Sequence, residues 1–152
     1  MTPLSLSEFA DKMQEIMPVI FREFASRHSS ELFKVKVTLP QFLVLNFLNV
    51  SGETKMKDLA QFMHVTTAAM TGIVDRLVRD SYVQRTYDPE DRRIIKIRLT
   101  PKGSELVKKI NQQRRQMIIR IFGKMPEADR RNYLRILTQV KDVLNKESSA
   151  TK

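Results

Sequence analysis

Residues 82–103 read YVQRTYDPEDRRIIKIRLTPKG and are the most informative stretch of the chain. Two segments of alternating residues, 82–87 and 94–99, flank a charged tip, which is the pattern of a β-hairpin with one core-facing side. In the tip, Asp91 lies two residues before Arg93, close enough for the carboxylate to hold the guanidinium extended. Charged hairpin tips are usually only solvated turns. The hairpin by itself therefore leaves its role open.

A helix-turn-helix pattern precedes the hairpin. Residues 56–63 have the apolar spacing of a helix, and His64 and Val65 make a short turn. Thr66 is a suitable N-cap for a second helix that reaches about Asp80. At about 100° per residue, one side of this second helix is apolar and faces the core. That side consists of Met70, Ile73, Val74 and Leu77.

The outward side of the second helix predicts contact with DNA. Its first half carries small side chains, which let a helix approach closely and place hydroxyl and methyl groups against base edges or phosphates. A helix-turn-helix followed directly by a charged hairpin is a winged helix, with the helix in the major groove and the wing reaching the minor groove. The predicted DNA-contacting residues are Lys55, Lys57, Thr66, Thr67, Ala68, Thr71, Gly72, Arg76 and Arg79, together with Asp91, Arg92 and Arg93 of the wing.

The distribution of charge supports this prediction without using any motif. The 152-residue chain has a net charge of +10. Residues 54–120 carry 15 basic and 7 acidic groups, whereas residues 1–53 carry 5 and 6, and residues 121–152 carry 7 and 4. The basic excess coincides with the motif and indicates a polyanionic partner. No apolar run approaches the roughly 20 residues needed to span a bilayer, and no signal peptide is visible. We therefore expect a cytoplasmic protein without membrane association.

The composition argues against several other classes of protein. The chain has no Cys, which excludes disulfides, thiolate metal sites and sensing by cysteine oxidation. His28 and His64 lack metal-ligand spacing and are predicted to be ordinary polar residues. There is no glycine-rich phosphate loop, nucleophile elbow or ordered carboxylate pair. We expect a binding protein with no catalytic residues, no metal and no cofactor.

The flanking segments are predicted to be helical. Ser5 and Glu8 form a capping box before a long helix, in which Pro18 should cause a bend. A shorter helix starts near Thr38. After the wing, Thr100 and Pro101 begin a long helix, and Pro126 opens the last one. The expected fold is mainly α: a winged helix-turn-helix with a two-stranded β wing, flanked by N- and C-terminal dimerisation helices. The expected regions of this single chain are a winged-helix lobe at about 38–100, a dimerisation region at about 5–34 and 101–146, and a flexible tail at 147–152.

The apolar stripes of the first and last two helices would be poorly covered by so small a lobe, and exposed stripes of this kind mark association surfaces. A homodimer covers them and presents two recognition helices about one DNA turn apart. The alternative is a monomer whose terminal helices fold back on themselves.

The chain resembles the MarR family of bacterial transcriptional regulators. The resemblance rests on Val74-Asp-Arg-Leu77, on Asp91-Arg-Arg93 and on the run from Ile97 to Gly103, and it extends from about Leu6 to Leu144. It implies a homodimer that binds a pseudo-palindromic operator and usually represses nearby genes. It also implies that Arg93 enters the minor groove, that Asp91 steadies it, and that Arg76 supports the wing or a phosphate. Ser81 stands where the family usually has a glycine with a left-handed backbone.

The resemblance further implies release by a small aromatic or anionic ligand bound between the dimerisation helices and the DNA-binding lobe. Met and Phe at helical spacing are more often plain core. The candidate ligand-binding residues are Met13, Met17, Phe21, Phe24 and Phe47.

Other classes of function remain open from sequence. The same fold is compatible with a non-specific or architectural nucleic-acid-binding protein without an effector, with an RNA-binding module, and with a basic face that docks an acidic protein. Sequence-specific binding of double-stranded DNA distinguishes a regulator from these. A regulator without a ligand, whose level and not its occupancy sets transcription, is a further option.

Overall fold

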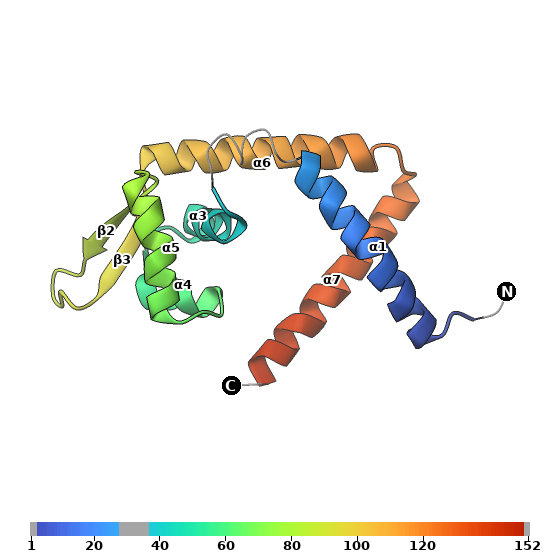
Figure 1. Ribbon diagram of the computed structural model, residues 1–152, viewed down its shortest axis with the longest axis horizontal. Coiled ribbons are helices and arrows are strands. Elements are labelled where there is room, and N and C mark those ends of the chain that lie inside the picture. Colours follow the sequence, from blue (N-terminus) through green and yellow to red (C-terminus); the bar gives the residue numbers. More distant parts are fainter. Residues whose placement is uncertain (1–2, 28–36, 151–152) are drawn as a thin grey trace. The chain divides into compact units, whose positions relative to one another are not determined.

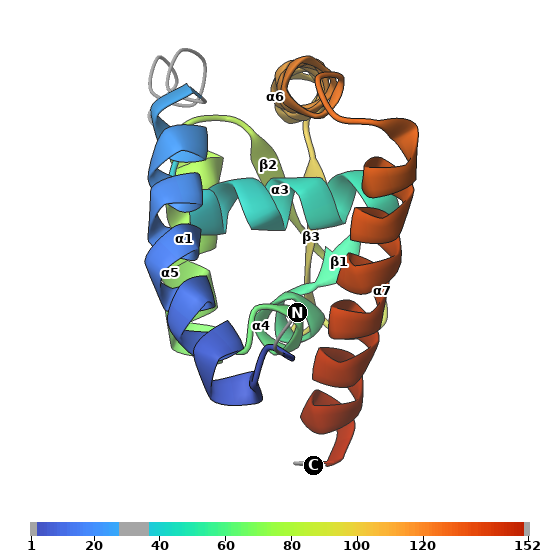
Figure 2. The same cartoon turned by 90° about the vertical axis from the view of Figure 1, so that its right-hand side faces the viewer.

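A computed structural model describes residues 3–27 and 37–150 of the chain (Figures 1 and 2). The chain divides into two compact units, residues 1–112 and 113–152, and helix α6 runs across their boundary. The elements in chain order are α1 (Leu6–Arg27), α3 (Leu39–Ser51), β1 (Thr54–Lys55), α4 (Met56–Phe62), α5 (Thr67–Arg79), β2 (Val83–Tyr87), β3 (Ile95–Leu99), α6 (Pro101–Phe122) and α7 (Glu127–Ala150).

The first unit contains the predicted winged helix. Strands β2 and β3 pair antiparallel, with Val83 opposite Leu99 and Tyr87 opposite Ile95. Helices α3, α4 and α5 pack on one another and on this sheet around one hydrophobic core. The predicted core side of α5 is confirmed, with Ile73 only half-buried at its margin. The largest fully buried side chains include Phe42, Leu45, Leu59, Met70, Leu77, Ile97 and Ile110.

The predicted helix starts are confirmed by their caps. The capping boxes at Ser5 and Thr38 are both formed: the main-chain N–H of Ser5 donates to Glu8 Oε2 at 2.9 Å, and that of Thr38 donates to Gln41 Oε1 at 2.8 Å. Thr100 accepts from the N–H of Gly103 at 3.1 Å as α6 begins. These side chains satisfy amide groups that have no partner within the helix.

The sheet has a third strand that the sequence pattern does not predict. Strand β1 contains only Thr54 and Lys55, which pair antiparallel with Ile97 and Lys96 of β3. The strand order is β1-β3-β2. A two-residue strand is too short to show alternation, so only the pairing reveals it. It makes β3 the central strand of the sheet.

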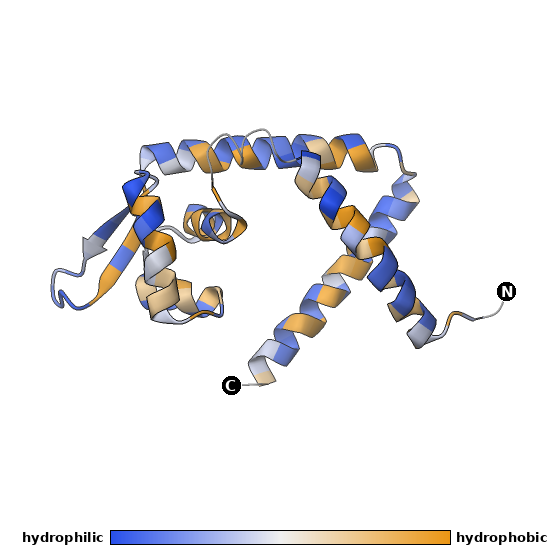
Figure 3. Ribbon diagram, in the orientation of Figure 1, coloured by the Kyte–Doolittle hydropathy of each residue, from blue (hydrophilic) through white to orange (hydrophobic). Residues whose placement is uncertain are grey.

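Helices α1 and α7 each carry an apolar stripe and have no buried residue (Figure 3). Helix α1 continues through Pro18 without interruption, so the bend expected there stays a prediction. Helix α7 extends to Ala150, beyond the boundary at 146 expected from sequence, because no Gly or Pro follows Pro126 to end it. Residues 28–34 of the expected dimerisation region lie outside the described residues. None of the helices in residues 3–27 and 37–150 is long and apolar enough to cross a membrane.

The end of α5, the base of the hairpin and the start of α6 meet at Tyr82. The main-chain N–H of Tyr82 donates to the carbonyl of Leu77 at 2.9 Å, and the Tyr82 carbonyl accepts from the N–H of Thr100 at 3.1 Å. The Thr100 hydroxyl donates to the carbonyl of Ser81 at 2.6 Å. Ser81 has φ 64°, which confirms the left-handed position expected there. The recognition helix, the wing and α6 are thus joined by main-chain contacts.

We predict that Gly103→Ala destabilises the winged-helix lobe. A Cβ atom at this position would lie 2.0 Å from the Tyr82 carbonyl oxygen, and a main-chain atom cannot rotate away as a side chain does. Overpacking of this kind costs about 1–3 kcal/mol or more. Urea unfolding measures the loss.

Gly72→Ala is the matched control for Gly103→Ala. No atom outside the local helix backbone lies within 4 Å of the Cβ that Ala would add at Gly72, and Gly72 has no positive φ. We therefore expect this variant to be at least as stable as the parent, by up to about 1 kcal/mol. Equal stability of the two variants would contradict the close approach at Tyr82.

Candidate nucleic-acid interface

The N-terminal half of α5 presents a face of small side chains. Thr66 caps the helix through its hydroxyl, which accepts from the N–H of Ala69 at 3.1 Å. Thr66, Thr67 and Ala68 are exposed and Thr71 is half-buried. The hydroxyl of Thr71 donates to the Thr67 carbonyl at 2.8 Å. The helix thus uses the hydroxyl hydrogen of Thr71, and its acceptor lone pairs and methyl group remain for a base edge.

Gly72 is not required by the fold. Its backbone is helical and the space where a Cβ would lie is open. A glycine inside a helix costs about 1 kcal/mol relative to alanine. Packing does not explain this cost. We predict that the missing side chain lets a sugar-phosphate strand approach the helix.

The wing tip holds Arg93 in the geometry expected from sequence. Asp91 Oδ1 accepts from both the main-chain N–H and the Nε of Arg93, each at 3.0 Å, and Oδ2 accepts from the guanidinium at 3.2 Å. The Arg93 side chain is nevertheless 91% exposed. A planar guanidinium held by two parallel bonds loses little further entropy when it binds, so this side chain is extended and preorganised.

A second aspartate, which sequence reasoning missed, shapes the same loop. Asp88 Oδ1 accepts from the main-chain N–H groups of Glu90 at 3.0 Å and Asp91 at 3.3 Å, and Oδ2 pairs with Lys96 at 3.1 Å. The signal was present in Asp88-Pro-Glu, because an aspartate whose side chain bonds main-chain amides two and three residues ahead commonly opens a turn.

Both wing aspartates remain charged at neutral pH. The bonds from Arg93 hold the pKa of the Asp91 carboxyl below its ordinary value, and the amide of Glu90, followed by Lys96, does the same for the pKa of Asp88. Each carboxyl is therefore already charged when the pH equals its ordinary pKa. It is protonated only when the pH falls through the lowered pKa. The wing geometry should therefore be unchanged between pH 6 and about 8.

The remaining predicted contact residues carry exposed positive charge. Arg76 and Arg79 lie in the last turns of α5, Arg92 lies in the wing, and Lys55 and Lys57 lie at the start of α4. Within residues 3–27 and 37–150, Arg76 forms no ion pair with the wing. The ion pair between recognition helix and wing is instead made by Arg85 of β2, which pairs with Asp75 of α5.

The five candidate ligand residues fall into two groups. Met13, Met17, Phe21 and Phe24 lie on α1, with Met13 and Phe21 exposed. Phe47 lies on α3, packs at the margin of the core and contacts the ring of Phe62, with 4.2 Å between ring centroids. Phe47 thus packs partly against the core and partly against the exposed ring of Phe62, and the ligand site remains a prediction.

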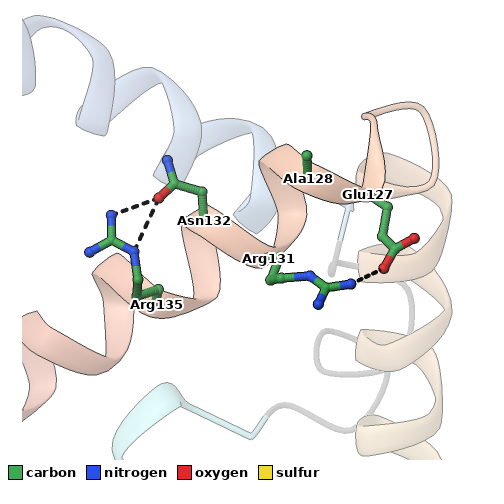
Figure 4. Close-up of a pocket in the computed structure, with 5 residues that line it drawn as sticks. All are labelled: Glu127, Ala128, Arg131, Asn132 and Arg135. Atoms are coloured by element: carbon green, nitrogen blue, oxygen red, sulfur yellow. Dashed lines mark hydrogen bonds and ion pairs between the residues drawn. The ribbon is translucent and has the colours of Figure 1, made fainter.

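A shallow depression lies along α7, lined by Glu127, Ala128, Arg131, Asn132 and Arg135 (Figure 4). Arg131 pairs with Glu127, and Arg135 donates to Asn132 Oδ1 at 2.7 Å. Both guanidinium groups are therefore occupied within the helix, and the depression does not have the character of an anion site. Among the described residues, no group of three or more His, Cys, Asp or Glu side chains is placed to hold a metal ion.

The comparison with known proteins identifies this architecture. The MarR family model matches residues 37–95, which include the helix-turn-helix and most of the wing. The HTH-type transcriptional repressor MdtR of Bacillus subtilis (strain 168) is 26% identical over 125 residues, covering 82% of this chain and 81% of MdtR. The crystal structure of RV1404 from Mycobacterium tuberculosis superposes with a TM-score of 0.77 and 27% identity, over 93% of this chain and 96% of RV1404.

The chain belongs to the MarR family. It is thus a transcriptional regulator of the helix-turn-helix type and not an enzyme. A further MarR-like fold is that of an S. aureus MepR mutant bound to an oligodeoxyribonucleotide, with a TM-score of 0.64 and 20% identity over 86% of this chain and 96% of the mutant. MarR-family membership confirms the resemblance inferred from the wing tip and from the start of α6.

We predict that Arg93→Ala weakens binding to a preferred DNA duplex at least tenfold, on the order of 1.4 kcal/mol. The variant removes the extended guanidinium and leaves the lobe folded, because Arg93 is almost fully exposed. Fluorescence anisotropy with a labelled duplex at about 150 mM salt measures the change. Lys141→Ala, which removes one exposed positive charge from α7, controls for net charge. Parent-like affinity of Arg93→Ala would refute the role of the wing tip.

Proposed function

We propose that this MarR-family protein is a sequence-specific DNA-binding repressor that acts as a homodimer on a pseudo-palindromic operator. The observation that carries the proposal is the combination of a small-residue face on α5 with an extended, carboxylate-held Arg93 on the wing of the same lobe. The relative MdtR is named a repressor, and the MepR mutant is bound to an oligonucleotide, which supports the same action for this chain.

Each part of the interface has a separate task in this proposal. The α5 face carrying Thr67, Ala68 and Thr71 enters the major groove, where hydroxyl acceptors and methyl groups distinguish base pairs. Arg93 enters the minor groove, which attracts guanidinium groups most strongly where it is narrow. The flanking cations bind phosphates and set the register, which carries no sequence information by itself. These cations are Lys55, Lys57, Arg76, Arg79 and Arg92.

The homodimer is supported by the apolar stripes of the terminal helices. On α1, Phe9, Ile16 and Ile20 recur at helical spacing and are exposed. On α7 the same holds for Leu134, Leu137, Val140 and Leu144. Apolar stripes of this length are unfavourable in water and are covered when two copies associate about a two-fold axis. Two recognition helices then meet two half-sites of an inverted repeat.

Release from DNA by a small aromatic or anionic ligand is a further part of the proposal. Its support is the group of Met and Phe side chains on α1, of which Met13 and Phe21 are exposed. Such a ligand binds the DNA-free protein more tightly than the DNA-bound protein. The ratio of these two ligand affinities is the factor by which the saturating ligand lowers the affinity for DNA.

Selection of bound duplexes from a random DNA library tests the proposed function. The purified protein is used at about 150 mM salt, where weak non-specific binding is screened. We expect enrichment of one inverted repeat with half-sites about one helical turn apart. A folded protein that enriches no sequence would instead be a non-specific nucleic-acid-binding or protein-binding module.

We predict that Leu137→Glu dissociates the homodimer. The substitution places a charge in the middle of the α7 stripe, where association would bury it without a partner. Size-exclusion chromatography with light scattering should give twice the 17.7 kDa chain mass for the parent and the single chain mass for the variant. Ser148→Glu adds the same charge at an exposed polar position of α7 and should remain dimeric. A monomeric parent at micromolar concentration would contradict the dimer.

A further inference from the structure

A carboxylate lies on the exposed face of α5 that is proposed to enter the major groove. Asp75 lies one turn after Thr71 on α5, and its side chain is 58% exposed. An unpaired negative charge there would face the phosphates of any duplex that the helix enters, and two like charges repel more strongly once water is excluded between them. An acidic residue at this position therefore requires an explanation.

The explanation lies on the neighbouring strand. Arg85 of β2 donates from its guanidinium to Asp75 Oδ1, and the Arg85 side chain is only 24% exposed. Helix α5 and strand β2 contact each other, so the pair bridges the two elements (Figure 1). The wing's other ion pairs, Asp88 with Lys96 and Asp91 with Arg93, lie entirely within the hairpin. Among the ion pairs of the described residues, Arg85 with Asp75 is the one that joins the recognition helix to the wing.

We propose that Arg85 is a positioning residue for DNA binding, which pairs with Asp75 of the recognition helix and neutralises its charge. Arg85 acts through Asp75 and not by contact with DNA, since more of the Arg85 side chain is covered than of its partner. The inference rests on the proposed function and deepens it by assigning the internal electrostatics of the same interface.

The proposal predicts a loss of DNA affinity that is not a loss of stability. Ion pairs with an exposed partner contribute little to folding. Removal of Arg85 leaves the lobe folded, but it leaves the Asp75 carboxylate uncompensated opposite the phosphates. If that carboxylate is the cause of the weaker binding, its own removal must restore much of the affinity.

A double-mutant cycle on the selected duplex tests the assignment. The variants are Arg85→Gln, Asp75→Asn and the double variant, with affinity measured by anisotropy at about 150 mM salt and folding checked by thermal unfolding. We expect Arg85→Gln to bind about tenfold more weakly, Asp75→Asn to stay within about threefold of the parent, and the double variant to recover to within about threefold. Arg85→Lys, which keeps the charge, should also stay within about threefold and controls for loss of side-chain packing.

Arg98→Gln is the matched control. Arg98 lies opposite Gln84 on the same hairpin and donates to the neutral amide oxygen of Gln84 at 3.1 and 3.0 Å. Its removal takes away the same charge without exposing a carboxylate, so Asp75→Asn should not restore whatever affinity Arg98→Gln loses.

Two results would overturn the assignment, and they differ from a failure of the proposed function. If the double variant binds as weakly as Arg85→Gln, Arg85 either contacts a phosphate directly or serves only the fold. The slope of log affinity against log salt concentration distinguishes these two cases. A slope whose magnitude is smaller by about one for Arg85→Gln than for the parent identifies the phosphate contact. If Arg85→Gln binds like the parent, no positioning role exists. A parent that prefers no duplex sequence refutes the proposed function itself, before any variant is compared.

Discussion

The main-chain carbonyl of Tyr82 is the point at which the recognition helix, the wing and α6 are joined. It accepts from the N–H of Thr100, which closes the base of the hairpin, and it lies so near Gly103 that no side chain fits there. Lys102 adds a bond from its ammonium group to the Asp80 carbonyl at 2.9 Å and lies 4.8 Å from the centre of the Tyr82 ring. Because these contacts set the direction in which the hairpin leaves α5, the position of Arg93 depends on them.

Carboxylates organise the cations of this interface. In a strongly basic lobe, acidic side chains would weaken attraction to a polyanion if they stood alone. Instead Asp91 extends Arg93, Asp88 shapes the loop and pairs with Lys96, and Asp75 pairs with Arg85. The net charge of the lobe sets the long-range attraction for DNA. The paired carboxylates determine the positions of these cations. They do so while lowering the net positive charge of the lobe only slightly.

Local patterns were sufficient to predict most of the lobe from sequence. The helix-turn-helix, the hairpin, the caps at Ser5, Thr38 and Thr66, and the Asp91 hold on Arg93 all depend on residues within a few positions of one another. What sequence did not reveal depends on pairing between distant segments. Strand β1 exists because two residues meet β3, and Arg85 meets Asp75 ten residues away because of how the hairpin folds back on α5. The periodicity of neighbouring residues predicts neither the pairing of β1 with β3 nor the pairing of Arg85 with Asp75.

The candidate site divides along the same line. Exposure of the α5 face and extension of the wing followed from helical and strand periodicity. The candidate ligand-binding residues cannot be assigned in this way, because Met and Phe at helical spacing look the same whether they line a pocket or pack in a core. Phe47 shows the ambiguity directly, since its ring packs against Phe62 at the margin of the core. A stripe of apolar residues predicts that a surface is covered, and its partner must be found by experiment.

Hydroxyl-radical footprinting of the selected duplex tests the central claim that one lobe reads both grooves. Because hydroxyl radicals attack from the minor groove, the account predicts a protected minor-groove segment beside each half-site, with the two half-sites about one helical turn apart. The minor-groove protection should disappear in Arg93→Ala while the half-site pattern persists at higher protein concentration. Uniform protection along the duplex, or a footprint unchanged by Arg93→Ala, would contradict the account.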